Sequence, residues 1–520
     1  MGVSSVRAFS STRSSTRSST RSSSRQSTGS ASVRSSNGSE LESLLVFSDV
    51  HLGSDILDGA ANKARRSQAI DRDLVELLAH YRTQPPRGAR WRIVIAGDFI
   101  DFIGMTIPSV PSPGLETPPT EEELEHGLGN AADHARLKLK RVAERHADVF
   151  GALASFVADG HALSLVHGNH DIEFYWDGVQ DDFRQILLRL ALETSGEELP
   201  LDRAAFLARI EFNPWFFYRD GVAYIEHGHQ YDPFCATDTV MTPLSPLDPR
   251  RVARGFSDTL LRFVVRRTNG MKEHGHESVG IVHYVTFGLR LGLTGMFRLA
   301  QCFASAVVEL FRLRRVYVSD AARALRHEHE QRVAKLAEAT RIGKDRLRAL
   351  LSLQVPPITS SIRGILASVL LDRLALALLA TLSLTVLGIV SAFRGHFVWG
   401  AAGVLLAWSL LHRYLASQRV IDPADVLVER ATQLARLFPA AFVVMGHTHV
   451  PVAVPAGQAT YVNVGSWAED DESSLPAART HLVIRVGEDG AEAQFCSWDS
   501  GAPKPMALPA LVPSVEEGEG

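Results

Sequence analysis

Five short polar motifs, each placed directly after a run of apolar residues, constrain the fold of this chain more than any other feature. In chain order they are SDVH, GDFID, GNHD, HGH and GHTH, and their polar residues extend from position 48 to position 449. The apolar runs before them have the length of buried β-strands and lie at 44–47, 93–96, 163–166, 222–225 and 442–445. A fold that places the ends of all five strands at one edge would gather these polar side chains into a single site.

Alternating strands and helices are the architecture that the rest of the pattern favours. A helical stretch at 131–157 separates the second motif from the third, and further strands are expected at 461–464 and 481–486. This alternation predicts an α/β fold. A proline-rich segment at 108–119 leads into a capping box at 120–123 that opens a helix. The segment is either a surface connection or a rim over the site.

The composition is that of a globular enzyme with a mildly acidic body. The 520 residues are 45% hydrophobic, which supports a sizeable core. The formal charge is -4, but residues 1–40 hold six Arg and one Glu, so the remainder carries about -9. This balance disfavours nucleic acid as a partner. The Ser- and Arg-rich segment 1–40 has no apolar run and is expected to be disordered, either solvated or in contact with an anionic surface.

Three cysteines indicate the redox environment. Cys235, Cys302 and Cys496 lie far apart and form no CxxC pair. Neither a disulfide framework nor a cysteine zinc site is therefore expected, and a reducing, cytoplasmic environment fits best.

Two apolar runs in the middle of the chain predict attachment to a membrane. Residues 374–393 contain no charge over 20 positions, enough for a helix to cross about 30 Å of hydrocarbon. A second run at 397–411 is short for a full span, though it carries Trp399 and Trp408 as interfacial anchors. The short connection predicts an antiparallel hairpin; a buried hairpin in a soluble core is the alternative. Basic residues at the open end favour a cytoplasmic catalytic domain: Arg363, Arg373, Arg413 and Arg419, against Arg394 in the connection.

The region upstream of the hairpin combines apolar and basic residues. Residues 281–311 carry a broad apolar stripe, which suits a helix lying in the membrane interface or packed on the hairpin. The charges of a preceding basic cluster either favour anionic headgroups, at about 1 kcal/mol each, or form a solvated helix face. This cluster comprises Arg250, Arg251, Arg254, Arg262, Arg266 and Arg267.

The residue types in the five motifs are those that bind transition metals. Asp49 and His51, at i and i+2 on an extended segment, would point to one side and bind one ion together. Asp98 can use both carboxylate oxygens to bridge two ions, and Asn169 can add a neutral carbonyl oxygen. Three further residues add imidazole nitrogens: His227, His447 and His449. The mixed oxygen and nitrogen set suits two divalent ions of Mn, Fe or Zn rather than Ca or Mg.

A pair of ions at such a site would support hydrolysis of a phosphate ester or diphosphate. Ions about 3.5 to 4 Å apart bind phosphate oxygens, lower the pKa of a bridging water and neutralise developing charge. His170 follows Asn169 and is placed to act as a general acid toward the leaving group. Asp101 could accept the other ring proton of His170 and fix its orientation.

The ordered set of motifs resembles that of the calcineurin-like metallophosphoesterase superfamily. The resemblance covers residues 44 to about 235 and 435 to about 490. It implies a β-sandwich flanked by helices, an αββα arrangement, with a dinuclear metal site. The first metal ligands that it implies are Asp49, His51, Asp98 and His449. The second set is Asp98, Asn169, His227 and His447. His170 matches the family's catalytic acid and Asp101 its orienting carboxylate.

Departures from two subfamily patterns bear on the substrate. Protein Ser/Thr phosphatases carry Arg after the second Asp and a GNHE motif, whereas Phe102 follows Asp101 here and the third motif is GNHD. Bacterial lipid A pathway hydrolases that cleave UDP-diacylglucosamine share the HG motif and membrane association, but typically have Arg where His170 stands. The predicted membrane hairpin favours a lipid-linked phosphate or diphosphate as substrate, and a nucleotide or another phosphorylated small molecule is the alternative.

These inferences divide the chain into segments with different roles. We expect a metallophosphoesterase domain formed by residues 41–235 and 431–495, a helical insertion at 236–430 and a C-terminal tail at 496–520. The predicted function is a membrane-associated, dinuclear-metal phosphoesterase. One alternative is a membrane-bound sensor or scaffold that binds metal or nucleotide without turnover. A nuclease of the same superfamily is another.

Overall fold

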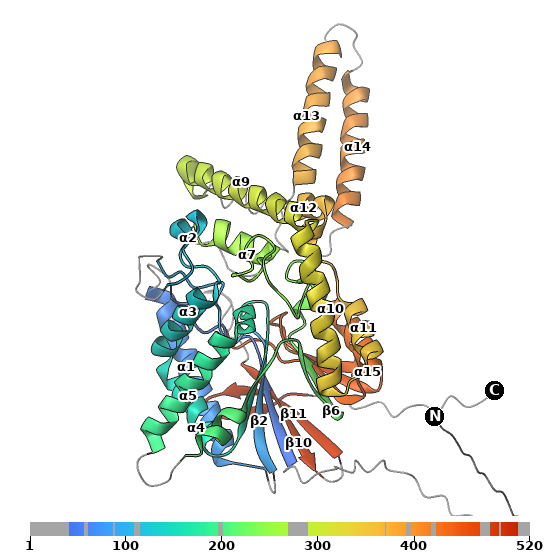
Figure 1. The fold of residues 1–520 in the computed structure, drawn as a ribbon. Helices are drawn as coiled ribbons and strands as arrows, with labels where there is room; N and C mark the ends of the chain where they lie inside the picture. Colours follow the sequence, from blue (N-terminus) through green and yellow to red (C-terminus); the bar gives the residue numbers. More distant parts are fainter. Residues whose placement is uncertain are drawn as a thin grey trace, which may run out of the picture.

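The structure is a computed structural model that describes most of the chain between residues 41 and 507. The described residues are 41–56, 61–86, 89–108, 115–195, 201–268, 290–369, 371–391, 397–417, 423–468, 479–487 and 490–507. They form an α/β protein with two mixed sheets, of seven and five strands, and a helical middle region (Figure 1). The α/β class expected from the sequence is confirmed. The Ser- and Arg-rich segment 1–40 lies outside the described residues.

Four parallel strands form one side of the seven-stranded sheet. Its order is β12-β11-β10-β1-β2-β3-β4, and β1 to β4 run parallel, while β10 pairs antiparallel with β1. The strands are β1 (Leu41–Phe47), β2 (Ala89–Ala96), β3 (Ala162–Val166), β4 (Ile210–Asn213), β10 (Thr480–Gly487), β11 (Gly490–Asp499) and β12 (Ala502–Pro505). Because β12 ends at Pro505, this sheet continues past residue 495.

The five-stranded sheet has three parallel strands at its centre. Its order is β5-β6-β7-β9-β8, in which β6, β7 and β9 are parallel and the two edge strands are antiparallel to their neighbours. The strands are β5 (Phe216–Arg219), β6 (Gly221–Glu226), β7 (Ala440–Met445), β8 (Val452–Ala456) and β9 (Ala459–Asn463). β6 and β7 pair directly although the helical middle region lies between them in sequence.

All five strands predicted ahead of the motifs are present. SDVH follows β1, GDFID follows β2 and GNHD follows β3, while HGH follows β6 and GHTH follows β7. The strands expected at 461–464 and 481–486 correspond to β9 and β10. Parallel pairing therefore places three motifs at one edge of the first sheet and two at one edge of the second.

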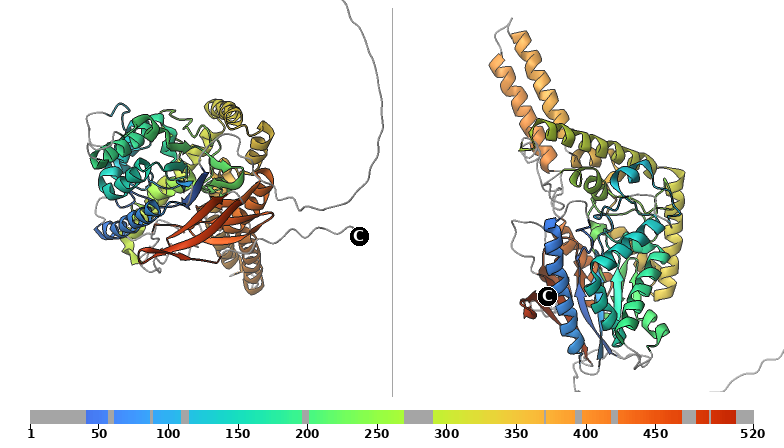
Figure 2. Two further views of the ribbon diagram at one scale, coloured as in Figure 1. Left: turned by 90° about the horizontal axis from the view of Figure 1, so that it is seen from below. Right: turned by 90° about the vertical axis from the view of Figure 1, so that its left-hand side faces the viewer.

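The alternation of side chains along the strands explains how the layers stack. On β1, Leu44 and Val46 belong to an apolar cluster shared by both sheets, whereas Leu45 and Phe47 pack against helices. The helices packed on the seven-stranded sheet are α1 (Ala61–Thr83), α3 (Ala132–Arg145), α4 (Ala147–Ala158) and α5 (Asp177–Ser195). Those on the five-stranded sheet are α10 (Asp320–Thr340), α11 (Lys344–Leu353) and α15 (Ala424–Leu437). Figures 1 and 2 show these helices on the outside of the paired sheets.

The single helix predicted at 131–157 is two helices in the structure. The stretch 131–157 is divided at His146 into α3 and α4, because His146 has a non-helical φ of -112°. Its ring joins two other segments: Nε2 accepts a hydrogen bond from the Gly53 backbone at 3.1 Å, and Nδ1 lies 2.8 Å from Asp71. These tertiary contacts break a pattern that is locally helical.

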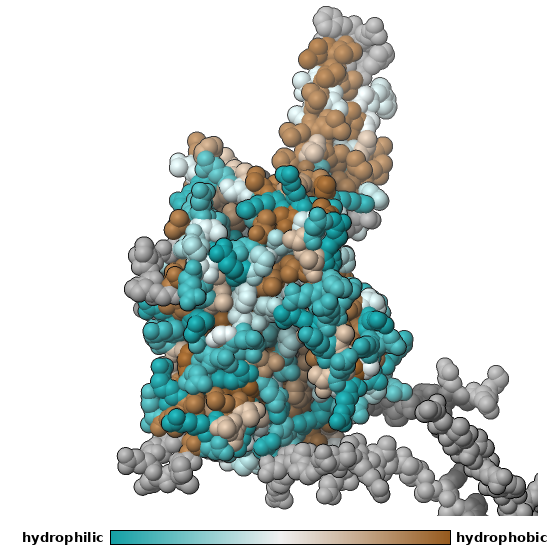
Figure 3. Space-filling model, viewed as in Figure 1, coloured by the Kyte–Doolittle hydropathy of each residue, from teal (hydrophilic) through white to brown (hydrophobic). Residues whose placement is uncertain are grey.

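The middle region contains two helices long and apolar enough, by length and composition, to cross a bilayer. Among the described residues these are α9 (Gly292–Tyr317) and α13 (Leu371–Ser391). α14 (Phe397–Ser417) packs beside α13 and is longer than the predicted run 397–411. None of the α13 span is buried, and Figure 3 shows apolar residues covering the projecting hairpin. Residues 281–289 and the predicted connection around Arg394 lie outside the described residues.

The hairpin projects away from the sheets. Figures 1 and 2 show α13 and α14 extending from the body and α9 crossing near their base. α12 (Ile362–Ser368) precedes α13 and contacts α9. The exposed apolar surface of the hairpin thus lies at one end of the molecule, away from the sheets.

Most of the basic cluster has protein carboxylates as partners. Helix α2 (Glu121–His126) begins with the predicted capping box, in which Thr120 and Glu123 bond reciprocally. Arg251 pairs with Glu123 at 2.7 Å, Arg254 pairs with Glu122 at 2.6 Å, and Arg262 also pairs with Glu122. The expectation that these three arginines face headgroups or solvent is therefore wrong, because α2 neutralises them. The proline-rich segment before α2 lies partly outside the described residues, and its role as a rim stays a prediction.

Candidate metal centre

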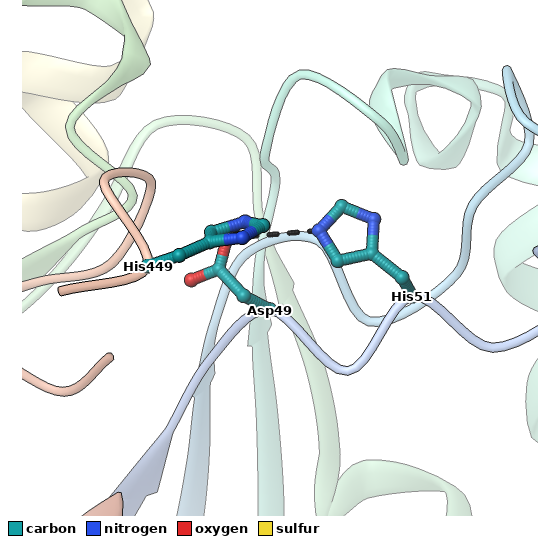
Figure 4. A group of neighbouring side chains, drawn as sticks. All are labelled: Asp49, His51 and His449. Atoms are coloured by element: carbon teal, nitrogen blue, oxygen red, sulfur yellow. Dashed lines mark ion pairs between the residues drawn. The ribbon is translucent and has the colours of Figure 1, made fainter. Parts of the chain in front are cut away.

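The first and last motifs meet although 400 positions separate Asp49 from His449. Asp49 is fully buried, and its Oδ1 lies 3.1 Å from Nε2 of His449 and 3.8 Å from Nε2 of His51. Figure 4 shows both imidazoles converging on this carboxylate. The three side chains have ligand atoms within 4.8 Å of one another and form a group able to hold a metal ion.

Asp98 lies between this group and a second one. Its Oδ2 is 3.2 Å from Nε2 of His227 and 3.7 Å from Nε2 of His51. Its Oδ1 accepts a hydrogen bond from the His170 backbone at 2.8 Å. The sequence predicts that both Asp98 oxygens bridge ions, but the contacts place one oxygen toward both histidines and the other on the GNHD loop. Asp49, Asp98 and His227 form the second metal-capable group.

Asn169 and His447 complete the surroundings of His227. The Oδ1 atom of Asn169 lies 3.1 Å from Nε2 of His227, and the rings of His227 and His447 are 5.3 Å apart. Nε2 of His447 lies 3.0 Å from Oδ2 of Asp232. Nδ1 is therefore the nitrogen of this ring that is left to bind an ion. All seven predicted ligands are thus gathered around one site.

Next to the ligands lies the predicted acid pair. Nδ1 of His170 is 2.8 Å from Oδ1 of Asp101. The His170 ring also stands edge-on to His51, with centroids 4.6 Å apart. Arg266 from the basic cluster approaches the same carboxylate, with Nη2 at 4.0 Å from Oδ2 of Asp101. The pair therefore lies against the metal-capable groups rather than in a separate pocket.

Burial and the charges of neighbouring groups shift the pKa values at the site. Burial raises the pKa of Asp49 and of Asp98, but the surrounding histidines outweigh it and hold both values below the usual range. Burial lowers the pKa of both His170 and His227, but neighbouring carboxylates outweigh it. Asp101 contributes most at His170 and Asp98 at His227, and each pKa is raised to about 9. The site thus combines two carboxylates with lowered pKa values and two histidines, His170 and His227, with raised ones.

The backbone at the site is strained. Eight described residues other than glycine have positive φ, and five of them belong to the motifs. These five are Asp49, His51, Asp98, His447 and His449, with φ between 51° and 70°. Left-handed backbone of this kind is unfavourable for such residues and concentrates at functional sites. It also corrects the expectation that Asp49 and His51 lie on an extended segment.

Close packing explains two of the motif glycines. A Cβ atom at Gly168 would overlap the Asp98 carboxylate, and one at Gly446 would overlap Ser48 and Asp49. Glycine at these positions lets the GNHD and GHTH loops approach the carboxylates of the other motifs.

Supporting contacts fix the ligands. Nδ1 of His227 lies 2.9 Å from the Ala96 carbonyl, which directs Nε2 toward Asp98. The Ser48 hydroxyl donates to Oδ2 of Asp49 at 2.5 Å. Asp171 accepts from the backbone of Gly168 and of Phe99, at 2.6 and 2.8 Å, and so ties the GNHD loop to the GDFID loop.

The sequence missed part of this arrangement. Asp232, Cys235 and His447 form a further metal-capable group, and Cys235 has no recognisable motif around it. Asp232 stands five positions after His227; this spacing alone favours a role in its own loop and gives no sign of the His447 contact. The role of Ser48 as a hydrogen-bond donor to Asp49 could have been predicted, because Ser48 directly precedes Asp49 in the sequence.

A cavity of about 600 Å³ opens onto the site. Its lining near the motifs includes Asp98, Asn169, His170, His447 and His449. Sites for small molecules have volumes of this order. A ligand can therefore reach the metal-capable groups and the His170 ring from one space.

The donor atoms fit divalent transition metals. Carboxylate oxygens, imidazole nitrogens and an amide oxygen converge, and the carboxylates are buried, where a bound cation would offset their charge. These buried His and Asp groups could hold metal ions. No protein-family model matches the chain, and a comparison with curated proteins finds no match.

Proposed function

We propose that this protein is a membrane-attached, dinuclear-metal phosphoesterase of the calcineurin-like metallophosphoesterase type. The observation that carries the proposal is the position of Asp98, whose Oδ2 lies 3.2 Å from His227 and 3.7 Å from His51. A carboxylate oxygen between two sets of imidazoles is suited to be shared by two ions. The pair of sheets flanked by helices supports the same assignment.

Each ion would have its own ligand set, with Asp98 in both. The first set is Asp49, His51, Asp98 and His449. The second is Asp98, Asn169, His227 and His447. Two bound divalent ions would supply Lewis acidity for the phosphoryl oxygens and lower the pKa of a water held between them. Mn, Fe and Zn suit these nitrogen and oxygen donors.

His170 would provide the proton that hydrolysis requires. The water oxygen forms a bond to phosphorus while the bond from phosphorus to the leaving oxygen breaks. The leaving oxygen takes a proton from Nε2 of His170, because Nδ1 is engaged by Asp101. A phosphate ester yields the alcohol and the phosphate that carries the new oxygen. A diphosphate yields two phosphate products. One proton from the attacking water is released, and His170 is reprotonated from solvent.

The exposed hairpin would hold the enzyme at a membrane. α13 has an apolar span with none of its residues buried, and α14 exposes Trp399 and Leu406. Burying apolar surface of this kind in lipid is favourable. Arg373 and Arg413, at the end of the hairpin nearest the sheets, favour the cytoplasmic side for the catalytic body.

Turnover of chromogenic esters by the full chain in detergent tests the proposal. The Mn-loaded protein should hydrolyse p-nitrophenyl phosphate, bis(p-nitrophenyl) phosphate or both. His170→Ala should lower kcat roughly 100- to 10,000-fold, and Asp98→Asn should abolish metal-dependent turnover. His327→Ala, an exposed histidine on α10, is the matched control and should leave the rate unchanged.

The alternatives predict different results. Tight metal or nucleotide binding without any product would support a sensor or scaffold. Cleavage of DNA with a strong dependence on salt would support a nuclease. Full activity in Asp98→Asn would exclude the proposed centre.

A further inference from the structure

The cavity at the metal centre extends far beyond the ligands into the helical middle region. Besides the motif residues, its walls include Leu313 and Val316 of α9, Leu325 of α10, and Thr359 just before α12. Its volume of about 600 Å³ exceeds what a phosphate group needs, since this size accommodates a drug-sized molecule. The extension therefore has room for a further part of a ligand.

Away from the motifs, the cavity lining includes several leucines beside polar residues such as Ser257 and Asp258. The leucines outside α9 and α10 that line the cavity are Leu244, Leu247, Leu260 and Leu261. Two arginines also contribute to the lining, but each has a carboxylate partner: Arg254 lies 2.6 Å from Glu122, and Arg326 lies 2.7 Å from Asp238. Because both arginines are paired with carboxylates and leucines lie beside them, this lining suits the hydrocarbon part of a ligand better than it suits the charged and polar groups of a nucleotide.

The cavity wall is joined to the root of the hairpin. The loop that follows the HGH motif receives two backbone hydrogen bonds from the segment before α12: Val355 donates to Gln230 at 3.1 Å and Ile358 to Pro233 at 2.7 Å. Phe234 of this loop packs in one buried cluster with Phe256, Leu310 of α9 and Ile365 of α12. The same loop therefore lines the cavity and contacts the helix that leads into α13.

α9 faces two environments. Leu313 and Val316 line the cavity, while Leu293, Phe297 and Val308 are exposed, at 81%, 67% and 70%. The helix crosses near the base of the hairpin (Figures 1 and 2). A helix in this position would lie along a bilayer that contains the hairpin, with the cavity on its inner side.

We propose that the cavity binds the hydrocarbon chain of a membrane-resident phosphate ester or diphosphate and places its phosphate at the metal centre. The proposal rests on the proposed phosphoesterase function and names its substrate class as an amphiphile. The apolar lining carries it, together with the continuity from the HGH loop to the hairpin.

A series of esters with increasing chain length tests this assignment in the full-length, Mn-loaded protein. The probes are n-alkyl phosphates and p-nitrophenyl n-alkyl phosphates from methyl to decyl, each kept below its critical micelle concentration. In whichever ester series the protein hydrolyses, kcat/KM should rise roughly fourfold per methylene over the chain lengths that the cavity holds. A flat dependence on chain length would overturn the proposal.

Variants of α9 and α10 test whether the alkyl chain binds in the cavity or on the exposed surface of α9. Val316→Trp on α9 and Leu325→Trp on α10 should each reduce the gain in kcat/KM from methyl to decyl ester at least tenfold, because the indole ring fills the cavity. Val308→Trp on the exposed face of α9 is the matched control and should keep the full gain. An equal gain in all three variants would contradict binding in the cavity.

A binding measurement distinguishes failure of the proposed phosphoesterase function from failure of the proposed amphiphile-binding cavity. If no ester is hydrolysed, the proposed function fails, and calorimetric binding of decyl phosphate against methyl phosphate then tests the cavity alone. Tighter binding of decyl phosphate that Val316→Trp removes would support the amphiphile site without turnover. Equal affinity for the two phosphates would overturn it.

Discussion

Nε2 of His449 lies 3.1 Å from Oδ1 of Asp49, so the first and last motifs of the chain belong to one centre. The helical middle region lies between them in sequence, yet β6 and β7 on its two sides pair directly. The insertion therefore leaves the pairing of these two strands in place. Several consequences of the arrangement can be measured.

Removing His449 should empty one metal position and leave the other. The ligands of the second set, His227 among them, do not depend on His449, so His449→Ala should bind about one ion per chain where wild type binds two. Elemental analysis after dialysis measures this ratio. His327→Ala should keep two ions, and loss of both ions in His449→Ala would mean that the two positions are not separate.

Replacing Asp101 should change the pH profile without changing the metal content. Burial lowers the pKa of His170, but Asp101 and then Asp98 raise it to about 9. A general acid is active only while protonated, so activity is lost as the pH rises through this value. In Asp101→Asn the loss should move about one to three pH units lower, with kcat reduced roughly 10- to 100-fold. A profile identical to that of wild type would argue that Asp101 does not orient His170.

Asp232 should position His447. Its Oδ2 lies 3.0 Å from Nε2 of His447, and a carboxylate on the second ring nitrogen fixes a histidine ligand. Asp232→Asn should therefore weaken the affinity for one metal ion roughly 10- to 100-fold, measured by competition with a chelator. The matched control Asp238→Asn alters a carboxylate farther along the same segment and should leave the affinity for the metal unchanged.

The contact between α2 and Arg251 should contribute to stability in a pH-dependent way. Glu123→Gln breaks a buried ion pair and should lower the free energy of unfolding by about 3 kcal/mol at neutral pH. Burial raises the pKa of Glu123, but the hydrogen bond from Arg251 outweighs it and lowers the value to about 2. Because the folded pKa is below the unfolded value of 4.5, the stabilisation is complete above that pH and is lost as the pH falls toward 2.

The difference in unfolding midpoint between wild type and Glu123→Gln measures this effect. It should be largest above pH 5 and should shrink on acidification. Glu121→Gln, at an exposed position on the same helix, should shift stability by no more than about 0.5 kcal/mol. A pH-independent difference would show that the charge of Glu123 is not the cause.

Local patterns were sufficient to predict the strands and the convergence of the motifs. Each apolar run was followed by a polar ligand type, and parallel strands bring their carboxyl ends together, so Asp49, Asp98 and Asn169 could be placed near one another. The gathering of His227 with His447 followed the same reasoning in the second sheet. These are features that a few adjacent residues determine.

What the sequence did not reveal depends on contacts between distant segments. Asp232 and His447 are 215 positions apart, and α2 neutralises Arg251 from 128 positions away. The break at His146 arises from Gly53 and Asp71, while its own neighbours favour a helix. The positive φ of Asp49 and His51 is likewise not specified by any pattern in the neighbouring sequence.

The dinuclear centre is tested most directly by the rate of p-nitrophenyl ester hydrolysis while Mn²⁺ is titrated into protein stripped of metal. We predict that the rate rises until two ions are bound per chain and then stays constant, and that Asp98→Asn shows no such rise because Asp98 is shared by both positions. Absence of hydrolysis at every metal loading, or an unchanged titration in Asp98→Asn, would contradict the dinuclear centre.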